Sequence, residues 1–557
     1  MNMRYIKFMS VAIAVFMAVA PLSAQENKHV EVTKNYTHEV APAKKMVAPT
    51  EISDAPVIEP EIIYNVNPET WQIELEDHNF KPATASYWDL NRPQHLFARV
   101  AAGYPLTTDA VVRYTTHNLR LGYFGVGIDH NANFAAKHNG YGDELTMAKS
   151  YEMSNAINVG GGLVVGRQMF EASIDYDSDI VNRYALKTSD RIYFHDGNVH
   201  LRYGDDFVNL SRLNFGVEVD GGRWSQRLPL GDETTCVAEH SANVAANVAR
   251  NFKGNIVGIK AGFGLWKGNN YTEYSDMAVN VGVNYARSFG IINLKAELQY
   301  MYDKVAGRDK ASHFIMPAAR LDFDFGKVGV QPYIEFATNI THNGIESLYG
   351  QNRYIDFVAM QTKFNLMAST RSYDLHLGMS GSDKASKVAY RVYLGASFIR
   401  DQMVWYVTEI GTFGFTQTDN TRLFAGAEVE YRPVGGLKLA ANVRGHLDYT
   451  NSLYAISDPK LNAGIVAEYR LKRWKFGVSG DLTGCREWSS DELAVGESVV
   501  AFEAPMTFDL RANIAFRATN SVEVFVMGNN LLDQNIYDFA HYYRNGIGFM
   551  VGAKIDF

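Results

Sequence analysis

The feature that most constrains the fold of this chain is a long series of segments in which apolar and polar residues alternate with a period of two. In Thr507–Arg517 every second residue is apolar, and the charged Asp509 and Arg511 lie on the opposite face. A helix would spread these charges around its whole circumference, so the period predicts a β-strand. The same alternation recurs in residues 294–300, 423–432 and 461–471. The sequence therefore predicts a chain built from strands.

Alternating segments continue from residue 95 to the C-terminus, separated by turn signals such as Gly221-Gly222 and Gly268-Asn269-Asn270. Tight connections alternate with long polar ones, such as residues 131–150 and 484–506, as in β-barrels that cross a membrane. We expect an all-β fold in which residues 95–557 form a transmembrane, antiparallel, up-and-down β-barrel. At about ten residues per strand and a connection of similar length, this barrel has about 22 strands, within a range of about 20 to 24.

A soluble all-β protein, such as a sandwich or a propeller, would also carry one apolar face on each strand. Many alternating segments run to about ten residues, nearer the ~9–11 that cross a bilayer than the roughly five or six usual in soluble sheets. No window after residue 24 reaches the ~18 consecutive apolar residues of a spanning helix. We also interpret the aromatic residues near strand ends as membrane girdles: Tyr104, Tyr123, Trp224, Trp266, Trp405, Tyr406, Trp474 and Trp488.

The N-terminus has the pattern of an export signal. Arg4 and Lys7 precede the apolar run Phe8–Leu22, and small residues follow up to Ala24. We expect residues 1–24 to be a cleavable signal peptide, which places the chain in the outer membrane of a Gram-negative cell. The alternative is an N-terminal membrane anchor, which we disfavour because the apolar run is shorter than the ~18 residues that span a bilayer.

Residues 25–94 separate this signal from the first alternating segment. Nine of the 15 prolines lie in residues 1–105, and proline interrupts strand pairing. We therefore expect residues 25–94 to be a proline-rich periplasmic segment and a possible partial plug. Within it, residues 78–93 are dense in aromatic and turn residues, and they are our candidate for partial occlusion of the barrel.

Charge and cysteine content exclude several classes of function. Lys and Arg number 53 and Asp and Glu number 61, which gives a formal net charge of −8. An acidic chain with 20% charged residues has no polycation signature, so we expect no nucleic-acid partner. With only Cys236 and Cys485, the chain cannot form a disulfide-dense scaffold or a multi-cysteine zinc or iron–sulfur site.

Motifs for catalysis, cofactors or metals are weak in this sequence. Asp175, Asp177 and Asp179 could offer carboxylates to Ca²⁺, but we prefer a strand that runs into a solvated loop. An outer-membrane enzyme with a Ser–His–Asp site is a further alternative, and no Gly-x-Ser-x-Gly elbow supports it. We therefore expect no catalytic residue, no cofactor and no metal ion, and we do not expect an enzyme.

The C-terminus carries the most specific motif. Phe549, Ile555 and Phe557 share one face of the expected last strand, and Phe557 is the final residue. A barrel must close its last strand on its first, and this terminal aromatic residue resembles the signal read by the barrel-insertion machinery of Gram-negative bacteria. We therefore expect that machinery and outer-membrane lipid to be partners of the chain.

A turn sequence just upstream resembles the end of TonB-dependent receptor barrels. In that family the penultimate strand runs into an Asn-Leu-Leu/Phe-Asp turn followed by an aromatic residue. The matching positions here are Asn530, Leu531, Leu532, Asp533 and Tyr537. An Asn/Asp-rich hairpin turn is the simpler alternative. The resemblance implies a receptor-like barrel that takes up a solute across the outer membrane.

The chain departs from that family before the first strand. Such receptors carry a plug domain larger than residues 25–94, and this segment lacks the alternating pattern of a plug, so we expect the plug domain to be absent. Residues 30–33 are faintly similar to a TonB-binding box, which could pair as an added strand, although we prefer a mobile linker. The departure leaves TonB dependence open.

Two functions are consistent with these features. The first is solute transport through a polar lumen, for which we expect six inward-facing charges: Asp509, Arg511, Glu468, Arg470, Glu428 and Glu430. The alternative is a plugless barrel that acts as a non-transporting subunit or scaffold of an outer-membrane complex. Its long loops and proline-rich segment would then dock surface lipoproteins or periplasmic proteins.

Overall fold

The computed structural model describes residues 95–118, 122–139, 146–149, 151–186, 190–207, 209–230, 233–269, 274–306, 308–326, 329–357, 367–383, 387–494 and 497–557. The expected signal peptide, residues 1–24, and the expected periplasmic segment, residues 25–94, lie outside these described residues. So do residues 30–33 and 78–93. In the described part of the chain, no helix has the length and apolar character needed to cross a membrane.

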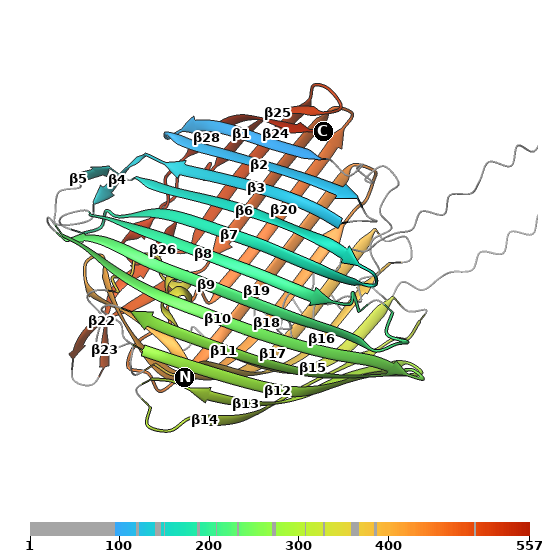
Figure 1. Cartoon of the computed structure of the whole chain (residues 1–557). Coiled ribbons are helices and arrows are strands. Elements are labelled where there is room, and N and C mark those ends of the chain that lie inside the picture. Colours follow the sequence, from blue (N-terminus) through green and yellow to red (C-terminus); the bar gives the residue numbers. More distant parts are fainter. Residues whose placement is uncertain are drawn as a thin grey trace, which may run out of the picture. The chain divides into compact units, whose positions relative to one another are not determined.

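Strands of the described residues form a closed antiparallel wall of 22 strands, which confirms the predicted fold (Figure 1). The first half consists of β1 (Leu96–Tyr104), β2 (Thr107–Asn118), β3 (Gly122–Asn133), β6 (Glu152–Val165), β7 (Gln168–Arg183), β8 (Asp190–Gly204), β9 (Asn214–Leu230), β10 (Glu233–Phe252), β11 (Asn255–Asn269), β12 (Tyr274–Phe289) and β13 (Ile292–Lys304). The second half consists of β14 (Ser312–Phe323), β15 (Val330–Thr341), β16 (Thr370–Ser382), β17 (Val388–Glu409), β18 (Thr412–Tyr431), β19 (Leu437–Thr450), β20 (Leu461–Leu471), β21 (Trp474–Thr483), β24 (Thr507–Arg517), β25 (Val522–Asn529) and β28 (Gly548–Asp556).

The wall closes because β1 pairs with β28 along its whole length, from Phe97 opposite Asp556 to Tyr104 opposite Phe549. The Leu96 amide donates to the Phe557 carbonyl at 3.1 Å, and the Phe557 amide donates to the Leu96 carbonyl at 2.9 Å. In a closed wall each strand pairs with a neighbour on both sides, which is the condition for crossing a bilayer with strands.

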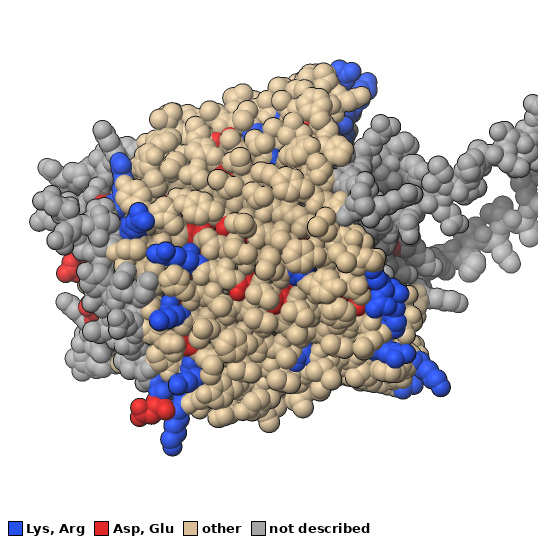
Figure 2. All heavy atoms as spheres, viewed as in Figure 1, with Lys and Arg blue, Asp and Glu red and all other residues tan. Residues whose placement is uncertain are grey.

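Alternation along each strand produces two different faces. In β24 the apolar Ile514 is 47% exposed on the outer face, whereas Asp509 on the inner face is only 8% exposed. Figure 2 shows the result on the outside: Lys and Arg gather towards the two ends of the barrel, and the band between them is mostly uncharged. Apolar side chains thus face the lipid, and charged side chains face the interior.

The two ends of the barrel differ in the length of their connections. We call the end with short turns the base; these include residues 166–167, 253–254 and 472–473, and the wall also begins and ends there. In one of these turns Lys253 and Gly254 have φ of 54° and 86°, values that suit a tight hairpin. We call the opposite end the mouth.

Three long connections lie at the mouth. They carry a short helix and two hairpins: α2 (Ile345–Gln351), β22 (Arg486–Ala494) with β23 (Glu497–Ala504), and β26 (Tyr537–Phe539) with β27 (Tyr542–Tyr543). A fourth connection carries β4 (Ala136–Asn139) and β5 (Thr146–Lys149). These elements decide what the mouth can do, because the wall itself is regular.

Candidate functional site: a cap at the mouth

Two connections fold over the inner side of the wall and form what we call the mouth cap, residues 342–357 and 530–547. Their apolar side chains share one buried cluster with the mouth ends of the strands, and Trp488, Tyr542, Phe357, Ile345 and Leu348 are each 0% exposed. This cluster has the burial of a soluble protein core, although it sits at the end of a barrel with a charged interior. Packed side chains therefore occupy part of the mouth.

The prediction of an aromatic girdle is wrong for four residues near the mouth. Tyr104 and Trp474 are 69% and 44% exposed, as lipid-facing rings would be. In contrast, four of the aromatic residues near strand ends are buried in the protein: Trp224 at 3%, Trp405 at 5%, Tyr406 at 7% and Trp488 at 0% exposed. The sequence cannot distinguish the two cases, because whether a ring meets lipid or is buried depends on which connection packs against it.

The first segment of the cap is held by the wall rather than by its own helix. The seven-residue α2 has no side-chain cap at its first residue, and a helix this short is marginal alone. The Ile345 amide donates to Glu239 Oε2 on β10 at 2.9 Å, and Tyr349 donates its hydroxyl to Asp179 on β7 at 2.7 Å. A Cβ at Gly344 would lie 2.3 Å from Glu239 Oε2, so a larger residue here would have to displace the Glu239 carboxylate.

The chain after α2 is held by one buried glutamine on β9. Gln226 is 1% exposed; its Nε2 donates to the Ile355 carbonyl at 3.0 Å, and its Oε1 accepts from the Phe357 amide at 3.3 Å. The amide side chain thus pairs with two backbone groups as a neighbouring strand would. Buried Arg183 adds an ion pair to Asp356, with an N–O distance of 3.0 Å. These contacts fix residues 355–357 inside the mouth.

The second segment of the cap begins with the turn that resembles the receptor family. Asn530 has φ of 45°, and its side chain donates to the Gln534 carbonyl at 2.7 Å while accepting from the Gln534 amide at 3.0 Å. The Asn530 amide donates to Asp509 at 3.2 Å, and Asp533 accepts from the Ile547 amide at 2.8 Å. Asn and Asp at these positions therefore shape the start and the end of residues 530–547.

The remaining residues of that motif lie beside this turn. The Leu531 amide donates to the Leu510 carbonyl at 2.9 Å, and the Leu532 side chain is 48% exposed. Tyr537 lies in β26, with its ring centroid 5.0 Å from that of Phe502. On the other side, Arg486 donates to the Asp538 carbonyl at 2.9 Å. Their functional roles stay predictions.

One aromatic stack joins the two segments of the cap. The rings of Tyr354 and Tyr542 are stacked with centroids 3.7 Å apart. Tyr542 also donates its hydroxyl to the Gly411 carbonyl, in the β17–β18 turn, at 2.9 Å. Tyr184, at the end of β7, donates to the Tyr543 carbonyl at 2.9 Å. The cap is thus a set of side-chain contacts between three parts of the mouth, with no strand pairing across it in the described residues.

One carboxyl group of the cap has a raised pKa. Glu346 is in the first turn of α2, and its side chain is partly exposed to solvent. Burial by the surrounding wall, together with the carboxylates of Asp196 and Glu239, raises the pKa of Glu346 to about 7. Because water reaches the exposed part of the Glu346 side chain, its raised pKa changes the stability of the cap less than it would for a fully enclosed carboxylate. The cap therefore carries a group that titrates near neutral pH.

The six charges that we expected on the inner face lie in three places along the wall. Asp509 and Arg511 form an ion pair at 2.9 Å, and Arg511 also contacts Asp481 at 2.6 Å. Glu428 accepts from Arg391 at 2.8 Å, and Glu430 from Arg432 at 2.7 Å. Glu468 lies 3.7 Å from Lys475, and Arg470 is opposite Lys475 in the β20–β21 register. Their role as lumen-lining residues stays a prediction.

The C-terminal residues that we expected to act in closure lie along β28 and at its end. Phe549 is opposite Tyr104 of β1 and Gly528 of β25, and Ile555 is opposite Ala98 and Val522. Phe549 and Phe557 are 45% and 63% exposed on the outer face. Their role as an insertion signal stays a prediction.

The residues considered for calcium lie within β7 instead of a loop. Asp175, Asp177 and Asp179 alternate along its inner face, and Asp179 is bound by Tyr349. Within the described ranges, no group of three or more His, Cys, Asp or Glu side chains is arranged to hold a metal ion.

Sequence reasoning missed the residues that make the cap, above all Gln226, Tyr354, Tyr542 and Glu346. The signal that could have found them is the aromatic content of the two long connections, such as Tyr349 and Tyr354 in one and Tyr537 to Tyr543 in the other. A solvated loop does not need this many rings, so their density indicates packing.

No protein-family model matches the chain, and no curated protein matches its sequence. Many solved structures match its fold. The copper transporter OprC has a TM-score of 0.63 at 13% identity, covering 83% of this chain and 80% of that one. The FrpB iron transporter from Neisseria meningitidis (F3-3 variant) has a TM-score of 0.67 at 9% identity, covering 84% and 82%. The ferric-catecholate import receptor Fiu from K12 E. coli has 0.62 at 9% identity, covering 84% and 82%. The chain therefore has the 22-strand barrel fold of TonB-dependent receptors.

Proposed function

We propose that this chain moves a solute across the Gram-negative outer membrane through the lumen of its barrel, with the mouth cap as the gate. The observation that carries the proposal is the contrast between wall and cap. Every pair of neighbouring wall strands is joined by backbone pairing, whereas the cap is held mainly by side-chain contacts such as the Tyr354–Tyr542 stack. Breaking a few such contacts costs far less than opening a wall, so the cap is the element that can move.

The fold supports an uptake role but does not identify the solute. The solved structures with this fold include a copper transporter, an iron transporter and a ferric-catecholate import receptor. A shared fold does not transfer a substrate, because substrate choice depends on the residues of the site. The charged pairs of the inner wall, such as Arg511 with Asp509 and Asp481, support the passage of a hydrated or polar solute.

Conductance of the purified chain in planar bilayers tests the proposal, with potassium chloride as the charge carrier. We compare the full chain with a double variant, Tyr354→Ala with Tyr542→Ala, with deletion of residues 25–93, and with both changes together. We expect the full chain to be nearly silent and the combined variant to conduct. Liposome swelling with the uncharged sugar raffinose then measures the width of the opened path. A barrel that stays sealed in all four forms would overturn the transport proposal.

A second candidate function is a subunit of an outer-membrane complex, and the β22–β23 hairpin favours it. This hairpin joins the wall through one parallel bridge, Val407 opposite Ser490, and it exposes Val499 by 40% and Val500 by 47%. A contiguous apolar patch outside the membrane band is typical of a protein-binding surface, and these two neighbouring residues would be part of such a patch. Affinity purification of the chain from native membranes in mild detergent separates the two candidates. Recovery with stable surface-lipoprotein or periplasmic partners supports the subunit, and recovery alone supports the transporter.

A further inference from the structure

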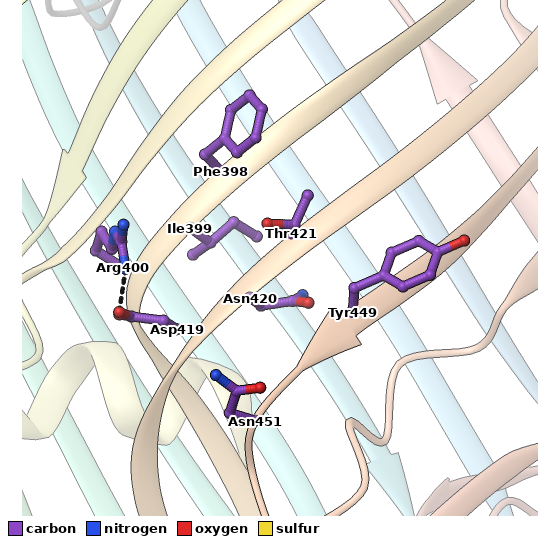
Figure 3. A pocket seen from close by; sticks show the side chains of 8 residues that line it. All are labelled: Phe398, Ile399, Arg400, Asp419, Asn420, Thr421, Tyr449 and Asn451. Atoms are coloured by element: carbon purple, nitrogen blue, oxygen red, sulfur yellow. Dashed lines mark hydrogen bonds and ion pairs between the residues drawn. The ribbon is translucent and has the colours of Figure 1, made fainter.

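The outer face of the wall has a pocket beside a bulge in β17. The register between β17 and β18 shifts between Ile399 and Gln402, and Asp401 has φ of 55°. A bulge bends the strand and redirects the side chains next to it. Here it opens a pocket of about 200 Å³ (Figure 3), whose lining includes Phe398, Arg400, Asp419, Thr421, Tyr449 and Asn451. We call it the rim pocket.

The rim pocket lies where the outer face changes from apolar to polar on three neighbouring strands. Phe398, Thr421 and Tyr449 are at the same level in the register. Towards the base, the outward residues are aliphatic: Leu394, Leu423 and Leu447. Towards the mouth they are charged or amide side chains: Arg400, Asp419 and Asn451. Phe398 and Tyr449 are 50% and 58% exposed. This order marks the boundary between lipid tails and water.

The polar side of the pocket is electrically neutral. Arg400 donates to Asp419, and 56% and 54% of the two side chains stay exposed. Asp419 also accepts from the Asp401 amide at 3.3 Å. A phosphate would have to compete with Asp419 for the single guanidinium in the lining. A hydroxyl group can donate to the carboxylate and accept from the guanidinium at the same time. The lining therefore suits hydroxyl groups better than an anion.

The size of the pocket limits its ligand to a small group. Sites for drug-sized molecules hold about 300–1,000 Å³, and the rim pocket holds about 200 Å³. A single sugar ring fits this description, since it offers several hydroxyl groups and an apolar face that packs on an aromatic ring such as Tyr449. We propose that the rim pocket binds the sugar headgroup of a membrane lipid in the leaflet at the mouth. The acyl chains of that lipid lie along Leu394 and Leu423.

Native mass spectrometry tests this with a defined probe. The full chain is held in the sugar-free detergent lauryldimethylamine oxide, and octyl β-glucoside is titrated in. We expect saturable binding of one probe molecule per barrel. Asp419→Asn removes the carboxylate with little change in shape, and we expect it to weaken binding about tenfold or more. Tyr449→Ala, which removes the stacking ring, weakens it as well.

The matched control is Asp491→Asn, which removes an exposed carboxylate from the β22–β23 hairpin and leaves binding unchanged. Retarded migration of unheated protein in detergent gels checks that each variant is a folded barrel. Equal binding by the natural chain and Asp419→Asn would overturn the proposal. Tighter binding of octyl phosphate than of octyl β-glucoside would overturn it too, because the pocket would then be an anion site.

Discussion

Tyr354 and Tyr542 lie 188 positions apart in the sequence, and their rings stack with centroids 3.7 Å apart and planes inclined by 14°. Tyr354 is 3% and Tyr542 0% exposed. This contact joins the two segments of the mouth cap, one between β15 and β16 and the other between β25 and β28.

Removal of one ring of this stack should loosen the cap. We expect Tyr354→Ala to destabilise the cap locally by about 3–5 kcal/mol, because it deletes a buried aromatic side chain and leaves a cavity. The measurement is hydrogen exchange of residues 530–547, which should lose protection while the wall strands keep theirs. Tyr114→Ala is the control, since this ring is 43% exposed on the outer face. Unchanged exchange in Tyr354→Ala would show that the stack does not hold the cap.

Removal of the Gln226 side chain amide should release residues 355–357 from β9. We expect Gln226→Leu to cost about 2–5 kcal/mol locally, because the Ile355 carbonyl and the Phe357 amide each lose their partner inside the protein. Exchange of the Phe357 amide reports the effect directly. Gln331→Leu, at the base end of β15, removes the same polar group elsewhere and should leave this amide protected. Equal protection of the Phe357 amide in both variants would show that Gln226 does not hold residues 355–357.

The cap should be more stable in weak acid than at neutral pH. The pKa of Glu346 is raised from 4.5 to about 7, so the closed cap favours the protonated carboxyl. This stabilisation is complete below about pH 4.5, declines as the pH rises, and is lost above about pH 7. Limited proteolysis of residues 342–357 should therefore be slower at pH 5 than at pH 8.

Glu346→Gln provides the control for this pH dependence. The variant carries a neutral side chain of the same shape facing Asp196 and Glu239, so its cleavage rate should vary much less between the two pH values after correction for the protease. A pH dependence as large as that of the natural chain would exclude Glu346 as its source.

The terminal aromatic residue should matter for assembly more than for the folded barrel. Phe557 is 63% exposed, and its amide and carbonyl pair with Leu96 through the backbone, which Phe557→Ala preserves. We expect this variant to lower the fraction of barrel assembled in the outer membrane several-fold, measured by heat-dependent gel migration. Val551→Ala, which shortens a 63% exposed side chain on the same strand, is the control. Equal assembly of both variants would count against an insertion signal.

The sequence by itself determined the wall. Residues 461–471 and 507–517 alternate so regularly that the expected segments coincide with β20 and β24. Alternation is a local property of each strand, because one face meets lipid and the other meets water. For the same reason the number of strands followed from the length of residues 95–557.

Only the tertiary structure decided how the mouth cap packs and where the rim pocket opens. Trp224 and Trp488 looked like girdle residues in the sequence, yet they are buried at 3% and 0% exposure. The contact between Tyr354 and Tyr542, and the hold of Gln226 on Ile355, join residues more than a hundred positions apart. No local period encodes such contacts, since they depend on the closed wall, which places the connections at the same end of the barrel.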